Sequence, residues 1–283
     1  MASSKPNALV GECFAEFIGT GLLIFFGVGC VAAMKLTGAD FGQWEISIMW
    51  GLGVAIAIYV TAGVSGAHLN PAVTIALASF HGFNKRKVLP YIMAQLLGAF
   101  AAAALIYGLY SNLFTDYEAS HNIVRGTVAS LDTASIFSTF PHPSLSFGGA
   151  FAVEFTITAI LMFAILAIGD DKNGAPRSAM GPLLIGLVIA VIGGSLGPLT
   201  GFAMNPARDF GPKLLTFFAG WNTVALTGAK DIPYFIVPIL APICGALFGG
   251  WAYPKFMGVY LPGNKCTLPN KCKGNTETPA VEA

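Results

Sequence analysis

Two copies of the tripeptide Asn-Pro-Ala stand inside long uncharged stretches of the sequence, as Asn70-Pro71-Ala72 and Asn205-Pro206-Ala207. Asn is a preferred N-cap and Pro is preferred at the first helical position, so each copy is expected to begin a helix. The amide NH₂ of an Asn side chain can also donate hydrogen bonds to a nearby molecule. One copy in a soluble loop would favour an ordinary turn, but two copies inside apolar runs argue against it.

Four charged residues accompany these motifs: Glu16, Glu154, Arg208 and Asp209. Charge is costly in hydrocarbon, so Arg208 is a functional candidate that can donate to hydroxyls and repel cations. In an active transporter the two glutamates would be proton or sodium sites. Their symmetric occurrence favours a scaffold role instead, in which each accepts hydrogen bonds from backbone N–H groups of a loop. Asp209 is expected to fix the second loop beside Arg208.

The composition indicates a membrane protein. Hydrophobic residues make up 55% of the 283 residues and charged residues 10%, whereas soluble domains carry about 25% charged residues. A net charge of +1 gives no support for a nucleic-acid partner. The five cysteines form neither a disulfide framework nor a zinc spacing. No metal or cofactor is expected, and no enzyme activity, because the apolar runs hold no nucleophile–base or metal-ligand cluster.

Runs without charge predict six membrane-spanning helices, each near the roughly 20 residues that a bilayer requires. Their expected bounds are 11–34, 44–63, 88–110, 150–169, 182–200 and 233–254. Two runs continue past a span by about half a membrane thickness, through each Asn-Pro-Ala motif. Such a segment is expected to enter and leave on the same side as a re-entrant half-helix. Irregular backbone at this depth must be buried in protein or line a wet cavity.

The residues before each motif are expected to be extended, because a residue that precedes Pro avoids the helical region. Extended backbone cannot satisfy its own carbonyls, so these should face protein donors or a passing molecule. The expected pore-lining carbonyls belong to Gly66, Ala67, His68, Leu69, Gly201, Phe202, Ala203 and Met204.

The chain repeats itself. Residues 66–72 align with 201–207, and residues 14–17 align with 152–155. Each half therefore holds three spans and one half-span, and an odd number of spans forces the halves into opposite orientations. The predicted fold is an all-α integral membrane protein with an inverted 3+3 repeat, whose site lies near the midplane where the half-helices meet.

The distribution of Lys and Arg predicts that both termini are cytoplasmic, because most of these residues then lie inside. The expected organisation is an N-terminal tail, a single channel domain, a long external loop between the two repeats and a C-terminal tail. The bounds are 1–10 for the first tail, 11–256 for the domain, about 11–110 and 150–256 for the repeats, 111–149 for the loop and 257–283 for the second tail.

Both motifs, both buried glutamates and Arg208 together resemble the major intrinsic proteins, the aquaporin-type channels, over roughly residues 11–256. Asp209 after the Arg resembles the aquaglyceroporin branch. The resemblance implies a homotetramer with one pore per subunit in a bacterial inner membrane. It implies a passive channel for glycerol and small uncharged polyols, with some water permeation and exclusion of ions and protons. A water-dominated pore and a coupled secondary transporter remain the alternatives.

The resemblance also assigns the narrowest point of the pore to Trp50, Gly193, Phe202 and Arg208. Trp50 and Phe202 would form an apolar corner for the CH groups of a polyol, and Arg208 would bind its hydroxyls. Without the resemblance, Trp50 would be an interface aromatic and Phe202 a core residue. Gly193 would be a helix-packing glycine, and that role stays open beside the other.

Overall fold

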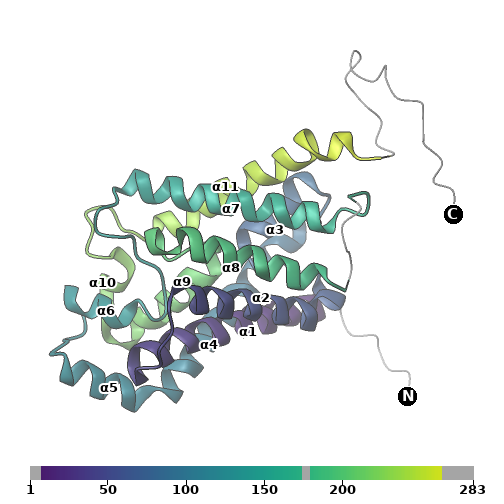
Figure 1. Ribbon diagram of the computed structural model, residues 1–283. Coiled ribbons are helices and arrows are strands. Elements are labelled where there is room, and N and C mark those ends of the chain that lie inside the picture. The colour runs from purple at the N-terminus through teal and green to yellow at the C-terminus, as the bar shows by residue number, and fades with distance from the viewer. Residues whose placement is uncertain (1–7, 174–178, 263–283) are drawn as a thin grey trace, which may run out of the picture.

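The computed structural model describes residues 8–173 and 179–262 as helices and connecting segments, with no strand among them (Figure 1). Six helices are long and apolar enough to cross a membrane. They are α1 (Ala8–Thr37), α2 (Gln43–Ser65), α4 (Val88–Leu109), α7 (Phe147–Gly169), α8 (Gly181–Thr200) and α11 (Ile236–Phe256).

The prediction of six spanning helices is confirmed, with bounds within a few residues of those expected. The largest difference is in α1, which begins at Ala8 inside the predicted N-terminal tail and continues to Thr37. The predicted C-terminal tail, with Cys266 and Cys272, lies mostly outside the described residues.

Two short helices begin at the prolines of the repeated motif: α3 (Pro71–Phe80) and α9 (Pro206–Thr216). At 10 and 11 residues they are about 15 Å long, roughly half of a hydrocarbon core. Their lengths are those of the two expected half-helices.

The packing of the helices follows the repeat. Within each half the first span contacts the second and the half-helix precedes the last span, while α3 packs on α11 and α9 packs on α4. Each half-helix is therefore held by the last span of the other half.

Glycines on α11 allow this helix to approach α7 closely. A Cβ at Gly245 or Gly249 would collide with backbone carbonyls of α7.

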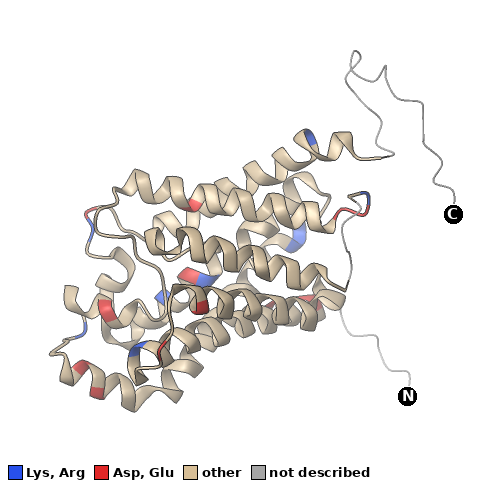
Figure 2. Cartoon of the chain, viewed as in Figure 1, with Lys and Arg blue, Asp and Glu red and all other residues tan. Residues whose placement is uncertain are grey.

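The start of α1 and the end of α11 lie at the same end of the bundle, at the right of Figure 1. Charged residues gather at the two ends of the bundle, with few inside it (Figure 2).

The remaining elements of the described chain are short: η1 (Lys85–Lys87), α5 (Ser111–Ser120), η2 (Val128–Ser130), α6 (Leu131–Ala134), η3 (Phe217–Trp221), α10 (Asn222–Thr227) and η4 (Gly258–Tyr260).

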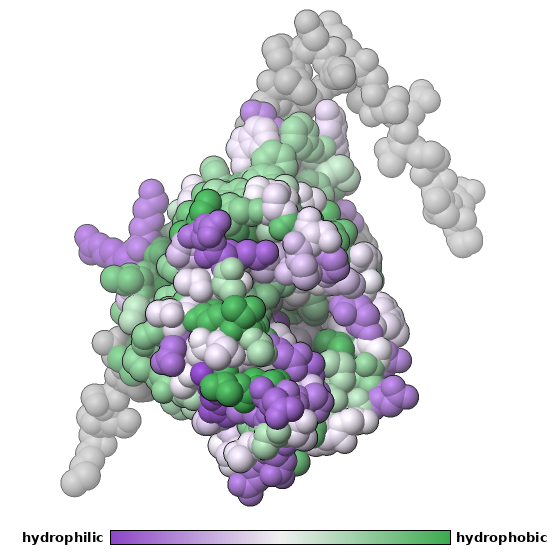
Figure 3. Space-filling view, turned by 90° about the vertical axis from the view of Figure 1, so that its left-hand side faces the viewer, coloured by the Kyte–Doolittle hydropathy of each residue, from purple (hydrophilic) through white to green (hydrophobic). Residues whose placement is uncertain are grey.

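The connecting segment 111–149 is more ordered than a plain loop, because it contains α5, η2 and α6. Together with α10 these helices cover the end of the bundle opposite the start of α1 and the end of α11 (Figure 1). Viewed onto that end, hydrophilic and hydrophobic side chains surround a hollow (Figure 3).

Candidate pore

A central cavity of about 160 Å³ lies between the two halves of the bundle. One wall consists of apolar side chains from the long helices, including Leu23, Ile165 and Ile189. The other wall consists of the two segments that precede the half-helices, 66–70 and 202–205. Nearly all of the expected pore-lining backbone therefore lies along this cavity.

Asn70 and Asn205 meet at the centre of that wall. The Oδ1 atom of Asn70 caps α3 by accepting from Ala72 N at 2.9 Å, and Asn205 caps α9 in the same way. The Nδ2 atom of Asn70 donates to Met204 O at 2.9 Å, and that of Asn205 donates to Leu69 O at 2.7 Å. One N–H of each amide thus cross-links the two loops, which leaves the second N–H for the cavity. The Leu69 and Met204 carbonyls, which were expected to line the pore, accept these cross-links.

The prediction of extended backbone before the motifs is wrong for four residues. Their φ angles are positive: 50° at Ala67, 52° at Leu69, 40° at Phe202 and 51° at Met204. The Asn residues directly before the prolines are extended as expected, with φ −156° and ψ 119° at Asn70 and φ −149° and ψ 110° at Asn205. Alternation of left-handed and ordinary conformations makes successive N–H groups converge on one side, where they can hold an anion.

The anions that these N–H groups hold are the two buried glutamates. Glu16 accepts from His68 N at 2.9 Å and Leu69 N at 2.7 Å, and also from Ser65 and Gln95. Glu154 accepts from the N–H groups of Ala203 and Met204 and from the Thr200 hydroxyl. Both glutamates have no exposed surface. The N–H groups of these four loop residues are therefore satisfied by the two glutamates.

Replacing Glu16 or Glu154 with Gln is expected to destabilise the protein in detergent. In either orientation of the new amide, one backbone N–H of the loop faces an NH₂ group and loses its acceptor. A buried unsatisfied donor costs about 1–3 kcal/mol. Glu12→Gln is the matched control, because Glu12 lies one turn before Glu16 and pairs with Lys87 at a partly exposed position. Denaturant titration should show a shift for the buried glutamates and little for Glu12; equal shifts would contradict the loop-holding role.

A second cavity of about 190 Å³ opens toward the end covered by the connecting segment. Gly201 lies along this second cavity, together with Gln43 and Thr139. Trp50, Phe202 and Arg208 line both cavities. These three side chains therefore form the boundary between them, which we call the constriction.

The constriction has two aromatic walls and one cation. The Trp50 and Phe202 rings stand at 82° with their centroids 6.3 Å apart, so they form an apolar corner. The Arg208 guanidinium carbon lies 3.9 Å from the centroid of the Trp50 ring, and Nη1 donates to Phe137 O at 3.4 Å. The remaining guanidinium N–H groups are the donors that this constriction can offer to a hydroxyl.

Gly193 lies behind the constriction and is not part of the lining of either cavity. A Cβ at this position would lie 3.0 Å from Cε2 of Phe202 and 2.7 Å from Oγ of Ser47. Its carbonyl accepts from Gln43 at 2.9 Å. The absence of a side chain at Gly193 therefore allows the Phe202 ring to occupy this wall.

Asp209 forms a fully buried ion pair with Lys213, 2.6 Å between Oδ2 and Nζ, in the second half-helix. Asp209 Oδ1 also accepts from the N–H and the hydroxyl of Thr139, both at 2.7 Å, and Lys213 donates to Thr139 O at 2.8 Å. The pair thus anchors the connecting segment beside the constriction. The i,i+4 spacing of Asp209 and Lys213 is the signal in the sequence that could have indicated this pair.

Gln95 and Thr74 form a second polar contact that the sequence did not indicate. Gln95 Nε2 donates to both Glu16 and Thr74, and the His68 ring nitrogen lies 3.1 Å from the Thr74 hydroxyl. The His68 ring also packs against Phe83 and Tyr91. His68 is therefore held by its ring while its backbone lies along the cavity.

The described residues contain no group of three His, Cys, Asp or Glu side chains that could hold a metal ion. What the site offers is two adjoining cavities with an apolar wall, a wall formed by the two segments before the half-helices, and a few fixed donors. This arrangement matches a small uncharged molecule that has both CH and OH groups.

Comparison with known proteins agrees with this geometry. The sequence matches the profile of the major intrinsic proteins over residues 3–253. It is 64% identical to the glycerol uptake facilitator protein of Escherichia coli (strain K12), over 99% of this chain and 98% of that protein. It is 58% identical to the propanediol uptake facilitator of Salmonella typhimurium, over 93% of this chain and 99% of that protein.

Among solved structures, the aquaglyceroporin of Plasmodium falciparum superposes with a TM-score of 0.78 at 36% identity. The alignment covers 88% of this chain and 96% of that one. Relatives and structure thus agree on one family.

Proposed function

Because the chain belongs to the major intrinsic protein family, we propose that it is a passive membrane channel for glycerol and other small uncharged polyols, with some water permeation. The relatives named for glycerol and propanediol uptake support this substrate class. Family membership also agrees with the prediction that the chain is a channel and not an enzyme.

The observation that carries the proposal is the constriction. Trp50 and Phe202 offer an apolar corner to the CH face of a polyol, while Arg208 offers N–H donors to its hydroxyls. Each hydroxyl that loses water must regain a hydrogen bond, since an unmatched one costs about 1–3 kcal/mol. The backbone carbonyls of segments 66–68 and 201–203 supply the acceptors along the passage.

Exclusion of ions and protons follows from two positive regions in series. Arg208 carries a full charge at the constriction, and the N-termini of α3 and α9 each carry about +0.5 elementary charge where the Asn side chains meet. Arg residues and half-helix dipoles are the elements that exclude cations and protons in aquaporin-type channels.

In this proposal the protein is a homotetramer in the inner membrane of a bacterium, with one pore per subunit and both termini in the cytoplasm. The exposed apolar side chains on the long helices, such as Leu97, Leu105 and Ile160, support contact with lipid. The basic cluster of η1 at Lys85–Lys87 supports the orientation, because cytoplasmic connections are rich in Lys and Arg. The 111–149 segment is then external.

The test is stopped-flow light scattering on proteoliposomes that contain the purified protein. We expect rapid re-swelling after a glycerol or 1,2-propanediol gradient and none after a sucrose gradient. Glycerol flux equal to that of protein-free vesicles would overturn the proposal. Water flux without glycerol flux would favour a water-dominated pore.

A coupled transporter differs from a channel in its response to gradients. Flux through a channel stays unsaturated over a wide range of glycerol concentration and does not depend on proton or sodium gradients. Accumulation of glycerol against its gradient, driven by protons and lost in Glu16→Gln or Glu154→Gln, would favour the transporter instead.

The double variant Gly193→His with Phe202→Cys is expected to lower glycerol permeability far more than water permeability. The imidazole would fill the space that the Phe202 ring occupies and narrow the passage with a polar wall. We expect roughly a tenfold drop in the glycerol-to-water ratio, which corresponds to about 1.4 kcal/mol of added barrier. Phe202→Cys alone is the control and should retain glycerol flux. Equal loss of both fluxes in a correctly folded double variant would contradict the role of the space beside Gly193 in setting the width of the constriction.

A further inference from the structure

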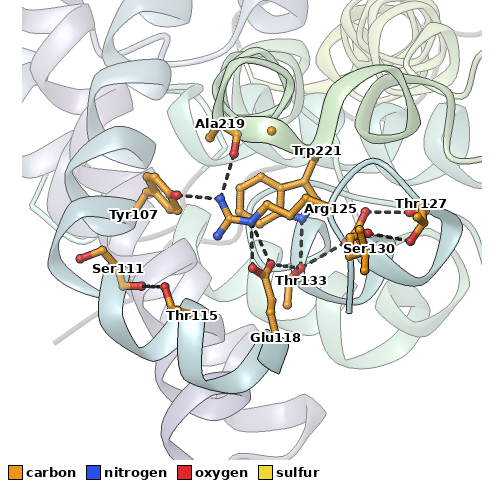
Figure 4. Close-up of polar contacts among 12 residues, drawn as sticks. Tyr107, Ser111, Thr115, Glu118, Arg125, Thr127, Ser130, Thr133, Ala219 and Trp221 are labelled. Carbon is orange, nitrogen blue, oxygen red and sulfur yellow. Dashed lines mark hydrogen bonds and ion pairs between the residues drawn. The ribbon is translucent and has the colours of Figure 1, made fainter. Parts of the chain in front are cut away.

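A polar cluster in the external segment is centred on Arg125 (Figure 4). Arg125 Nε donates to both carboxylate oxygens of Glu118, at 3.1 and 2.8 Å. Its Nη1 donates to the Tyr107 hydroxyl at 2.7 Å and to Ala219 O at 2.8 Å. One side chain therefore joins α4, α5 and the segment that follows the second half-helix.

The same cluster fixes the indole ring of Trp221, which has no exposed surface. The Arg125 guanidinium carbon lies 3.8 Å from the centroid of that ring. Trp221 Nε1 donates to the Thr133 hydroxyl at 3.0 Å, and Thr133 donates in turn to Glu118 at 2.8 Å. The indole is thus held both through its face and through its N–H, as Figure 4 shows.

Trp221 is one of three rings that enclose the fully buried side chain of Phe137. The Phe137 centroid lies 5.4 Å from that of Phe114, 6.0 Å from Trp221 and 6.2 Å from Tyr107. The carbonyl of Phe137 is the acceptor for Arg208 at the constriction. A continuous series of contacts therefore leads from Arg125 to the cation of the pore.

We propose that Arg125 and Glu118 are positioning residues for polyol selectivity: they fix Trp221 and Phe137, and through the Phe137 carbonyl they orient the Arg208 guanidinium. This inference rests on the proposed polyol channel. The Trp50 ring constrains the guanidinium on one face, and Phe137 O constrains one of its edges. Both contacts are needed to set the direction of its free N–H groups.

Polyols and water depend differently on that orientation. Glycerol must find two donors in fixed positions while its CH face rests on the aromatic corner, whereas a water molecule needs one. Loss of orientation is therefore expected to lower glycerol permeability more than water permeability. A defect that only reduces the number of folded channels would lower both by the same factor.

The experiment measures the glycerol-to-water permeability ratio in proteoliposomes for Arg125→Gln and for the double variant Arg125→Gln with Glu118→Gln. The double variant removes the uncompensated carboxylate that the single variant would leave. We expect the ratio to fall about threefold in both, as for weakening of one hydrogen bond to a charged group. Arg125→Lys keeps a cation over Trp221 and is expected to give an intermediate ratio.

Lys35→Gln is the control, because it removes a different ion pair of the same region, between Lys35 of α1 and Asp132 of α6, which involves neither Arg125 nor Glu118. Its ratio should equal that of the wild type. The inference would be overturned if the glycerol-to-water permeability ratio were unchanged in Arg125→Gln and in the double variant, or if it fell equally in Lys35→Gln. Either result would leave the proposed glycerol channel intact. Absence of glycerol flux in the wild type would overturn the proposed function, and this inference with it.

Discussion

Replacement of Arg208 with Val is expected to give the channel a measurable cation conductance while glycerol still passes with poorer selectivity. The guanidinium places a full positive charge at the constriction, and it is almost completely buried. Two like charges 4 Å apart repel by about 4 kcal/mol at an effective dielectric constant of 20, which corresponds to roughly a thousandfold in rate. Val keeps an apolar wall but removes both this charge and the donors for the polyol.

Adding Asn70→Asp and Asn205→Asp to Arg208→Val is expected to enlarge the leak well beyond that of either set alone. The carboxylates would cancel the partial positive charge of the two half-helix ends at the midpoint. An Asp side chain has no N–H to donate, so the cross-links to Met204 O and Leu69 O would also be lost. A control must therefore remove the cross-links without adding negative charge.

Asn70→Ser with Asn205→Ser and Arg208→Val separates them. Ser still caps a helix but adds no charge and has no amide to cross-link the loops. We expect this control to leak no more than Arg208→Val. The measurement is voltage-clamp conductance at equal surface amounts of each variant. If the Asp-containing variant passes glycerol yet is as electrically silent as the wild type, neither element is the barrier.

Lys213→Met is expected to destabilise the protein more than any single change discussed above. It would leave Asp209 as a fully buried carboxylate that keeps only its hydrogen bonds from Thr139. Breaking a buried pair by removing one partner costs about 3–5 kcal/mol. Asp209→Asn added to Lys213→Met should recover most of that loss, because Asn can still accept from Thr139.

Unfolding in detergent, followed by intrinsic fluorescence during denaturant titration, measures this effect. Lys87→Met is the matched control, since it breaks a partly exposed pair with Glu12 that is expected to contribute about 0–1 kcal/mol. If Lys213→Met were no less stable than Lys87→Met, or if the double variant were no more stable than the single one, the anchoring role of the pair would be wrong.

The main course of the chain could be predicted from the sequence because the rules involved are local. Charge is expensive in hydrocarbon, so the uncharged runs marked the six spans within a few residues of α1, α2, α4, α7, α8 and α11. The half-helices begin at Pro71 and Pro206 because an Asn N-cap followed by Pro suffices to start a helix. The repeat of these motifs then predicted that the two halves face one another.

Local rules did not predict the backbone before the half-helices. Ala67, Leu69, Phe202 and Met204 adopt positive φ, which side chains disfavour. The cost is offset only because Glu16 and Glu154, on distant helices, accept the converging N–H groups. The glutamates were visible in the sequence, but the conformation that they impose was not.

The tertiary structure alone decided what surrounds the constriction. Phe137 and Thr139 lie in a polar connection without periodicity, yet they contact Arg208 and Asp209 across about 70 residues. A lone Lys is costly in an apolar interior, so Lys213 taken by itself indicates an exposed residue. It is buried only because Asp209 and Thr139 satisfy its charge and donors. The sequence by itself therefore determined the spans, the half-helices and the residue types of the pore, since these depend on solvation and on neighbouring residues. The orientation of Arg208 depends on groups brought together by folding, and no local pattern encodes their distances.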